Sequence, residues 1–122
     1  MMTYEPVDVV LIPFPFTDFS TTKQRPALVI SSHAFNQTHN DIIVVAITSQ
    51  RPNDLEADEL LISNEGLATA GLSKPSKIKS GKIVCIDKRL VRKTLGTISQ
   101  NALAYVIERV IANLHRILKP EP

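Results

Sequence analysis

Apolar residues gather in short runs along most of the chain, separated by polar segments rich in turn-forming residues. The runs at 26–31 ("PALVIS") and 41–49 ("DIIVVAITS") are continuous, which is typical of strands covered on both faces, so we predict that they are central. The run at 7–16 ("VDVVLIPFPF") contains Pro13 and Pro15. Because proline donates no hydrogen bond to a neighbouring strand, this run predicts a strand at an edge or a bulge, which ends at the prolines.

Weaker patterns lie between and after these runs. Residues 58–63 ("DELLIS") predict a short strand, and 76–87 ("SKIKSGKIVCID") predict either two short strands or one strand bent at Gly81. The polar stretch at 32–40 ("SHAFNQTHN") is compatible with one helical turn, whereas 64–76 ("NEGLATAGLSKPS"), with two glycines, indicates a loop or a short turn.

The C-terminal part has helical periodicity. Its apolar residues recur at steps of three and four, which places them on one face of a helix: Leu103, Val106, Ile107, Val110, Ile111, Leu114, Ile117 and Leu118. Ser99 or Asn101 is suited to cap the start of this helix, and Pro120 to stop it. The preceding stretch at 87–96 ("DKRLVRKTLG") predicts another short helix that ends at Gly96.

Size and composition fit one globular domain over residues 1–122, with 43% hydrophobic and 21% charged residues. About five strands followed by helices predict an all-β or α+β domain built on a small, strongly bent sheet or partly closed barrel. The apolar runs are too short to span a bilayer and no secretory leader is visible, so the cytoplasm is the expected location. The single cysteine, Cys85, excludes an internal disulfide and is expected to be a buried strand residue.

Charge is distributed unevenly, although the net charge is only +2. Residues 74–93 contain eight of the 14 basic side chains and one acid, whereas 54–65 contain five acids and no base. This asymmetry indicates one face that attracts polyanions and another that does not, although a solvated basic stretch without a partner fits the charge equally well.

The stretch at 17–31 ("TDFSTTKQRPALVIS") places two cations, Lys23 and Arg25, at the entrance of a predicted central strand. Pro26 restricts Arg25 to an extended conformation, so its guanidinium, whose planar donors match a phosphate, projects from a rigid position. The other central run ends in the hydrogen-bonding residues Thr48, Ser49 and Gln50. If the two strands are neighbours, Thr48 lies close to Arg25. Taken singly, Arg25 is better explained as a surface charge and Thr48 as a strand-end cap or turn residue.

The ordered combination of "DVVLIPFPFTDFSTTKQRPALVIS", "VVAITSQ", "GLSKPSKIKSGKIVCID" and a terminal helix resembles the PemK/MazF family of toxin ribonucleases, from about Val7 to Leu118. The resemblance implies a β-rich α+β fold, a small SH3-like barrel of the CcdB/PemK type with short helices and a C-terminal helix. It also implies a homodimer that cleaves single-stranded mRNA without a metal ion or other cofactor, and a cognate antitoxin protein that blocks the RNA groove.

Matching the family's motifs to this sequence makes Arg25 and Thr48 the expected catalytic residues. Arg25 would stabilise the anionic phosphorus centre formed when a ribose 2′-hydroxyl attacks the adjacent phosphate, and Thr48 would hydrogen-bond the reacting groups. Two positions depart from the family pattern: Gly81 stands where an acid is common, which leaves the general base open between Asp18 and Asp87, and Val7 stands where glycine is common. The expected substrate-binding residues are Asp18, Phe19, Lys23, Ser49, Gln50, Lys77, Lys79 and Lys82.

Three alternatives stay open at this stage. His33, His39 and His115 are candidates for an acid–base pair, because histidine titrates near neutral pH. CcdB-type toxins have the same fold and poison DNA gyrase without a nuclease site. A catalytically weak relative would only bind RNA, through Lys77, Lys79 and Lys82.

Overall fold

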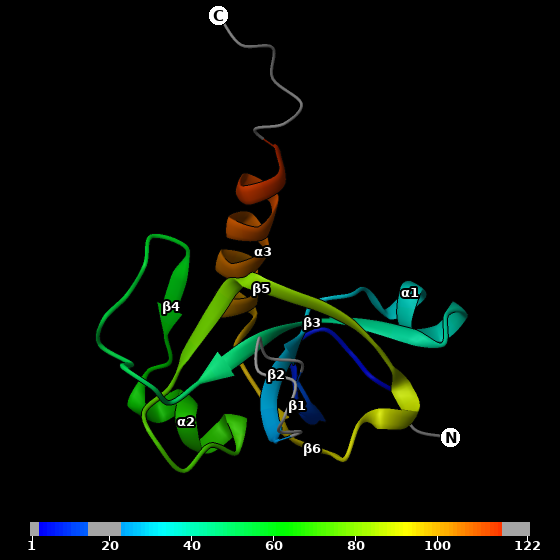
Figure 1. Ribbon diagram of the computed structural model, residues 1–122, viewed down its shortest axis with the longest axis horizontal. Helices are drawn as coiled ribbons and strands as arrows, with labels where there is room; N and C mark the ends of the chain where they lie inside the picture. Colours follow the sequence, from blue (N-terminus) through cyan, green and yellow to red (C-terminus); the bar gives the residue numbers. More distant parts are fainter. Residues whose placement is uncertain (1–2, 15–22, 116–122) are drawn as a thin grey trace, which may run out of the picture.

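The computed structural model describes residues 3–14 and 23–115 and contains one six-stranded antiparallel sheet that curls into a half-barrel (Figure 1). The strand order is β4-β5-β3-β2-β1-β6. The elements along the chain are β1 (Asp8–Pro13), β2 (Gln24–Val29), α1 (His33–Thr38), β3 (Asp41–Thr48), β4 (Glu59–Leu61), α2 (Asn64–Ala70), β5 (Lys77–Asp87), the 3₁₀ turn η1 (Lys88–Leu90), β6 (Lys93–Thr97) and α3 (Gln100–His115).

The two continuous apolar runs form the neighbouring strands β2 and β3, as predicted, and both are internal. Their alternating side chains build two cores. Val29, Val44 and Ala46 point into the barrel, and Leu28 and Val45 point to the other side. There they meet Ile78 of β5 and the buried Val106 and Val110 of α3. The barrel interior and the layer under α3 are therefore separate apolar clusters on the two faces of one sheet.

The stretch predicted at 76–87 forms one bent strand, β5 (Lys77–Asp87), and Gly81 lies in the irregular part of its pairing with β3. Ala46 of β3 pairs with Lys79, but the preceding Val45 pairs with Ile83, so the residues between 79 and 83 form a bulge. The bulge changes the alternation of the strand: before it, odd-numbered residues face the barrel side, and after it, even-numbered residues such as Ile86 do. A Cβ at Gly81 would lie 2.9 Å from the Asp58 carboxylate, so a side chain at the bend would require the end of the Asp58 side chain to move.

The change of alternation overturns the prediction that Cys85 is buried. Cys85 is exposed, because the bulge turns it and Ile83 away from the barrel interior. Without the bulge, the same two residues would occupy the interior in place of Val84 and Ile86.

The first strand is internal and not at an edge, but it ends at Pro13 as predicted, and its pairing with β6 has an irregularity between Val9 and Val10. β1 lies between β2 and β6, and Pro13 is its last residue, where a missing donor does little harm. The prediction of a helix at 87–96 is also wrong, because part of this stretch pairs with β1. Only Lys88–Leu90 form a 3₁₀ turn, and Lys93–Thr97 extend as β6 because they complete the hydrogen bonding of β1.

The loop predicted at 64–76 is also corrected, because Asn64–Ala70 form the helix α2. The Ser63 side chain accepts a hydrogen bond from the Gly66 N–H at its start, and Gly71 ends it in the left-handed conformation (φ 74°). These are standard capping signals for a short helix, and Gly71 is the glycine that marks its end.

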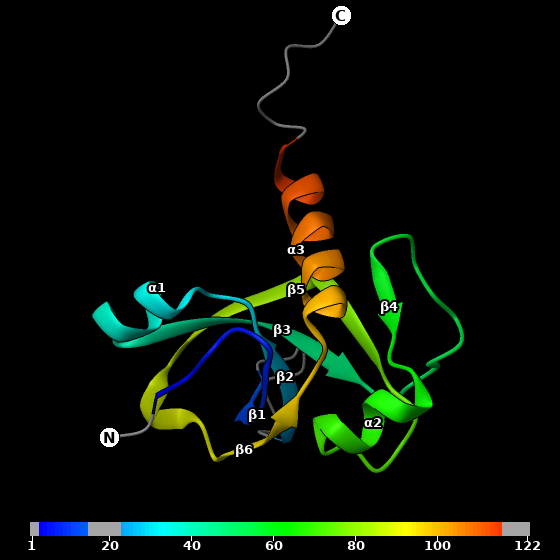
Figure 2. The ribbon, with the colours of Figure 1, turned by 180° about the vertical axis from the view of Figure 1, so that it is seen from behind.

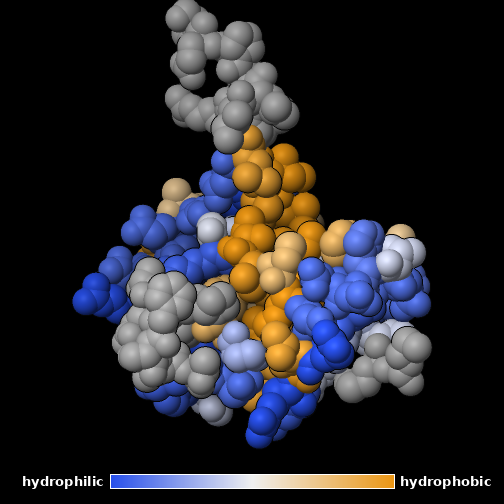
Figure 3. All heavy atoms as spheres, turned by 45° about the vertical axis from the view of Figure 1, so that its right-hand side comes forward, coloured by the Kyte–Doolittle hydropathy of each residue, from blue (hydrophilic) through white to orange (hydrophobic). Residues whose placement is uncertain are grey.

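The helix α3 begins as predicted, with the Ser99 hydroxyl accepting a hydrogen bond from the Ala102 N–H, while Pro120 lies outside the described residues. Its first turns pack on the sheet, Val110 in its second half is still buried, and the end of the helix extends beyond the sheet (Figure 2). Ile111 and Leu114 are 55% and 57% exposed. Figure 3 shows that apolar atoms form a continuous surface from α3 down to the body of the protein. In the described part of the chain, no helix is long and apolar enough to cross a membrane.

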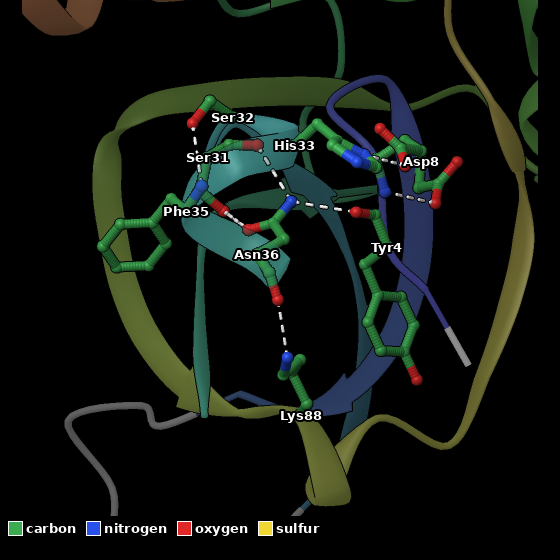
Figure 4. Close-up of polar contacts among 9 residues, drawn as sticks. Tyr4, Asp8, Ser31, Ser32, His33, Phe35, Asn36 and Lys88 are labelled. Atoms are coloured by element: carbon green, nitrogen blue, oxygen red, sulfur yellow. Dashed lines mark hydrogen bonds and ion pairs between the residues drawn. The ribbon is translucent and has the colours of Figure 1, made fainter. Parts of the chain in front are cut away.

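A buried polar cluster joins α1 to the N-terminal segment and to the end of β5 (Figure 4). The Asn36 amide donates to the carbonyls of Tyr4 and Ser31, each at 3.0 Å, and its side-chain oxygen accepts from the Ser31 hydroxyl. Lys88 Nζ donates to the Asn36 carbonyl at 2.6 Å. Because both amide hydrogens and the oxygen of Asn36 are bonded, the cluster fixes the helical turn predicted at 32–40 without leaving the buried amide unsatisfied.

Val7, which stands where the family often has glycine, has a left-handed backbone conformation (φ 88°). It follows Pro6 in a turn closed by a 3.0 Å hydrogen bond from the Asp8 N–H to the Glu5 carbonyl. A proline followed by a residue with positive φ is typical of a type II turn, in which glycine avoids the strain that valine incurs. The side chain of Val7 packs on the core under α3, which offsets that strain.

We predict that Val7→Gly is more stable than Val7→Ala by about 1 kcal/mol, because both variants lose the packing and only glycine relieves the strain. Urea unfolding of the two variants measures the difference. Val84 is the matched control, since it is half-buried in β5 without a positive φ, and there glycine should be less stable than alanine by roughly 0.5–1 kcal/mol. The same order at both positions would refute the strain at Val7.

Candidate functional site

The pairing of β2, β3 and β5 brings the predicted residues to one end and one face of the sheet. Arg25 stands two residues before Ala27 and Thr48 two residues after Ala46, and Ala27 and Ala46 are partners in the antiparallel ladder. Thr48 is in turn the partner of Lys77. Because side chains alternate along a strand, Arg25, Thr48 and Lys77 share the face that forms the barrel interior farther along.

These side chains line a cavity of about 500 Å³ at the rim of the barrel. The cavity contains six of the predicted site residues: Arg25, Thr48, Gln50, Lys77, Lys79 and Lys82. Ser49 and Lys23 are exposed and do not line it, and Asp18 and Phe19 lie outside the described residues. Ala46 and Ile47 supply the apolar part of the wall. The structure thus brings Arg25 and Thr48 together, whereas their chemical roles stay predictions.

One carboxylate holds two of the three lysines that line the cavity. Glu59 Oε1 is 2.8 Å from Lys77 Nζ, and Glu59 Oε2 is 2.8 Å from Lys79 Nζ. Glu59 Oε1 also accepts a 2.9 Å hydrogen bond from the Glu56 N–H. Burial raises the pKa of Glu59, but the Glu56 N–H and the two ammonium groups outweigh this effect and lower it to about 2. Glu59 is therefore ionised at neutral pH.

Sequence reasoning missed the acids and the arginine of the segment between β3 and β4. Arg51, Asp54, Glu56 and Glu59 all line the cavity, so the prediction that acids and bases occupy separate faces is wrong here. Nothing in the local sequence indicates that Glu59 lies near Lys79, because only the pairing of β4 with β5 places the two residues opposite each other. Among the described residues, no three acidic, histidine or cysteine side chains converge as ligands of a metal ion would.

Arg51 adopts a left-handed backbone conformation (φ 46°), and its carbonyl accepts a 3.1 Å hydrogen bond from the Asp54 N–H. Lys77 Nζ donates to the Asp54 carbonyl at 2.6 Å. These two bonds fold the segment back over the end of the sheet, which turns the side chains of Arg51 and Asp54 into the cavity wall.

The basic stretch of the sequence is divided between two ends of the sheet. Lys77, Lys79 and Lys82 lie at the cavity, whereas Lys88 and Arg89 follow the far end of β5, where Asp87 is the partner of Asp41. The hydrogen bonds from the Arg89 side chain and N–H lower the pKa of Asp87 to about 2. Asp87 therefore has a structural role as the cap of η1 and is not a proton acceptor at the cavity.

The histidines lie away from the cavity in the described part of the chain. His33 pairs with Glu5, and the ring of His39 stacks on Phe35 with 4.0 Å between centroids, both at α1. The side chain of His115 lies outside the described residues.

The structure is thus a curled six-stranded antiparallel sheet with a C-terminal helix and a cavity of mixed charge at its rim. The PemK-like, MazF-like toxins of type II toxin–antitoxin systems match this chain over residues 5–114. The chain belongs to this family.

Solved structures share its fold. MazF from Deinococcus radiodurans is 19% identical, with a TM-score of 0.76 over 94% of this chain and 99% of that one. An endoribonuclease in complex with its cognate antitoxin from a mycobacterial species is 15% identical, with a TM-score of 0.74 over 98% and 100% of the two chains. A MazE–MazF complex from D. radiodurans is 19% identical, with a TM-score of 0.72 over 93% and 97%. No curated protein sequence matches the chain.

We predict that Glu59→Gln lowers the free energy of unfolding by about 3 kcal/mol at pH 7, because it leaves the buried Lys77 ammonium without its counter-ion. The folded-state pKa of Glu59 is below its ordinary value of 4.5, so its contribution is present above that value and is lost as the pH falls toward about 2. The difference between wild type and variant should therefore shrink on acidification from pH 7 to about pH 3.

Urea unfolding at a series of pH values measures this difference. Ile78→Val is the control, because it removes one methylene group from the same strand and its cost of about 1 kcal/mol should not depend on pH. A Glu59→Gln cost that stays constant with pH would contradict the depressed pKa.

Proposed function

We propose that the protein is an endoribonuclease toxin that cleaves single-stranded RNA at the cavity. The observation that carries this proposal is the placement of Arg25 and Thr48 at one end of the sheet, in a cavity also lined by Lys79 and Lys82. Membership of the PemK/MazF-like toxin family supports it, as do the structural neighbours described as an endoribonuclease and as MazF.

The proposed reaction is attack of a ribose 2′-hydroxyl on the adjacent phosphorus, which forms a cyclic phosphate and releases the 5′-oxygen of the next nucleotide. The 2′-oxygen loses a proton and the departing oxygen gains one. Arg25 offers planar donors to the phosphate oxygens, where negative charge accumulates. Thr48 Oγ1 already accepts a 3.1 Å hydrogen bond from the Gln50 N–H, which orients its hydroxyl and leaves the proton available for a phosphate oxygen.

The proton acceptor is not Glu59. Its pKa of about 2 makes it a weak base, and its two oxygens are bonded to Lys77 and Lys79. Asp54 and Glu56 are the other carboxylates on the described cavity wall, and both side chains are exposed. Among the described residues we place the proton acceptor with these two, and Asp18, which lies outside the described residues, stays the other candidate.

We predict that the purified protein cleaves a long single-stranded RNA in the presence of a chelator, and that Arg25→Ala lowers the rate by about two to three orders of magnitude. Arg89→Ala is the matched control, because it removes the same charge at the far end of β5 and should cleave like the wild type. Gel analysis of the RNA fragments over time measures the rates.

Equal cleavage by Arg25→Ala and wild type would refute the assigned site. Binding of RNA without turnover would instead identify a catalytically weak RNA-binding relative. Trapped DNA breaks in a gyrase assay, unaffected by Arg25→Ala, would identify a CcdB-like inhibitor.

We further propose a homodimer that acts in the cytoplasm and is neutralised by a cognate antitoxin. The second copy is suggested by the exposed apolar residues of α3, Ile111 and Leu114, and by the apolar surface that runs from α3 to the body in Figure 3. An antitoxin partner is supported by the family and by the neighbours solved as complexes with an antitoxin or with MazE.

We predict that Ile111→Glu converts a dimer in solution into a monomer, because a carboxylate in an apolar interface loses its hydration. Size-exclusion chromatography with light scattering measures the mass. Ala112→Glu introduces the same charge on another side of the exposed half of α3 and should remain dimeric. A wild-type monomer, or a dimer insensitive to Ile111→Glu, would contradict this interface.

A further inference from the structure

Glu59 sits at the back of the cavity, at the point where β4 pairs with β5. Resting on the proposed ribonuclease function, we propose that Glu59 is a positioning residue that holds the Lys79 ammonium at the cavity so that it binds an RNA phosphate beside the bond that is cleaved. Lys79 would touch the substrate, and Glu59 would act only through Lys79.

The two lysines on Glu59 are not equivalent. The Lys77 side chain is 7% exposed and its ammonium is bonded both to Glu59 and to the Asp54 carbonyl. The Lys79 side chain is 30% exposed, and within the described residues its ammonium bonds only to Glu59. An ammonium has three N–H donors, so Lys79 retains two for a phosphate. Lys77 thus serves to neutralise and hold the carboxylate, while Lys79 is available to a ligand.

The charges of the cluster support the same division. One carboxylate and two ammonium groups leave a net charge of +1, and Lys77 is the buried partner that balances Glu59. The remaining positive charge resides on Lys79, the more exposed of the two, on the cavity wall that also carries Arg25. A cation held in place before the substrate arrives stabilises a phosphate better than one that must be ordered on binding.

Lys79 needs such a support because its neighbours in the sheet offer no other. Its cross-strand partners are Ala46 in β3 and Glu59 in β4. The methyl group of Ala46 leaves room for the cavity but cannot fix a flexible lysine stem. The partner in β4, Glu59, is 3% exposed and held by two other contacts, with Lys77 and the Glu56 N–H, so it provides a rigid anchor for Lys79 at 2.8 Å.

Steady-state cleavage of a short single-stranded RNA by Glu59→Gln, Lys79→Met and the double variant tests this role. Glutamine keeps the shape of the side chain but removes the charge that fixes Lys79. We expect Glu59→Gln to lower kcat/KM about tenfold, mostly through a higher KM, because the lost contact is to a flanking phosphate. In the Lys79→Met background the same substitution should change kcat/KM by less than about twofold, because the residue it acts through is gone.

Asp58→Asn is the matched control. It removes a carboxylate from the adjacent position, which hydrogen-bonds Asn113 of α3 and does not line the cavity, so kcat/KM should stay within about twofold of wild type. Circular dichroism at the assay temperature establishes that each variant is folded. If Glu59→Gln does not fold, the variant that combines Glu59→Gln with Lys77→Met replaces the buried pair as a unit. This combined variant is then compared with and without Lys79→Met.

The outcomes separate this inference from the function on which it rests. If wild type cleaves RNA and Arg25→Ala does not, but Glu59→Gln matches wild type, the positioning role is refuted and the proposed function stands. The positioning role is also refuted if Glu59→Gln costs as much without Lys79 as with it, because the effect is then structural. If wild type does not cleave RNA at all, the proposed function fails and the inference with it.

Discussion

The antiparallel pairing of β3 with β2 and β5 brings Arg25, Thr48 and Lys77 to one cavity. Side chains alternate between the two faces of a strand, so a shift of one residue in either pairing would move Arg25 or Lys77 to the face covered by α3. The two cores help to fix the register, because the same shift would move residues such as Val44 and Val45 into the opposite core, among different packing partners. The hydrophobic effect that closes the barrel thereby also fixes the polar end of the sheet.

The cavity is polar because the apolar residues on the barrel face of β2 and β3 end at Ala27 and Ala46. These small residues mark the boundary between the barrel interior and the rim, where cations and acids replace valine and isoleucine. The charges near this boundary are kept in order by a buried ion cluster, in which Glu59 bonds two lysines of β5. A buried carboxylate that lacked either partner would be costly, so the arrangement of the lysines and the stability of the fold depend on the same contacts.

The sequence predicted the elements whose patterns are strong and local. The continuous apolar runs predicted β2 and β3. The apolar residues at steps of three and four predicted α3, and Ser99 was predicted as its cap. The failures arose where tertiary contacts decide. Residues 93–97 form a strand only because β1 has an edge to pair with, and the bulge at Gly81 reverses the alternation that would place Cys85 inside.

At the site, Arg25 and Thr48 were predicted to meet because they lie at the ends of two strands that were expected to be neighbours. Glu59, Asp54 and Glu56 were missed because their position depends on how the β3–β4 segment folds back.

The exposure of Cys85 has a practical consequence. It is the sole thiol of the chain, it lies on the outer side of β5, and the strand carries it away from the cavity toward the end occupied by α1. A maleimide-linked fluorophore or spin probe can therefore be attached to the unmodified protein at one defined point, and the reporter would not obstruct the cations at the opposite rim.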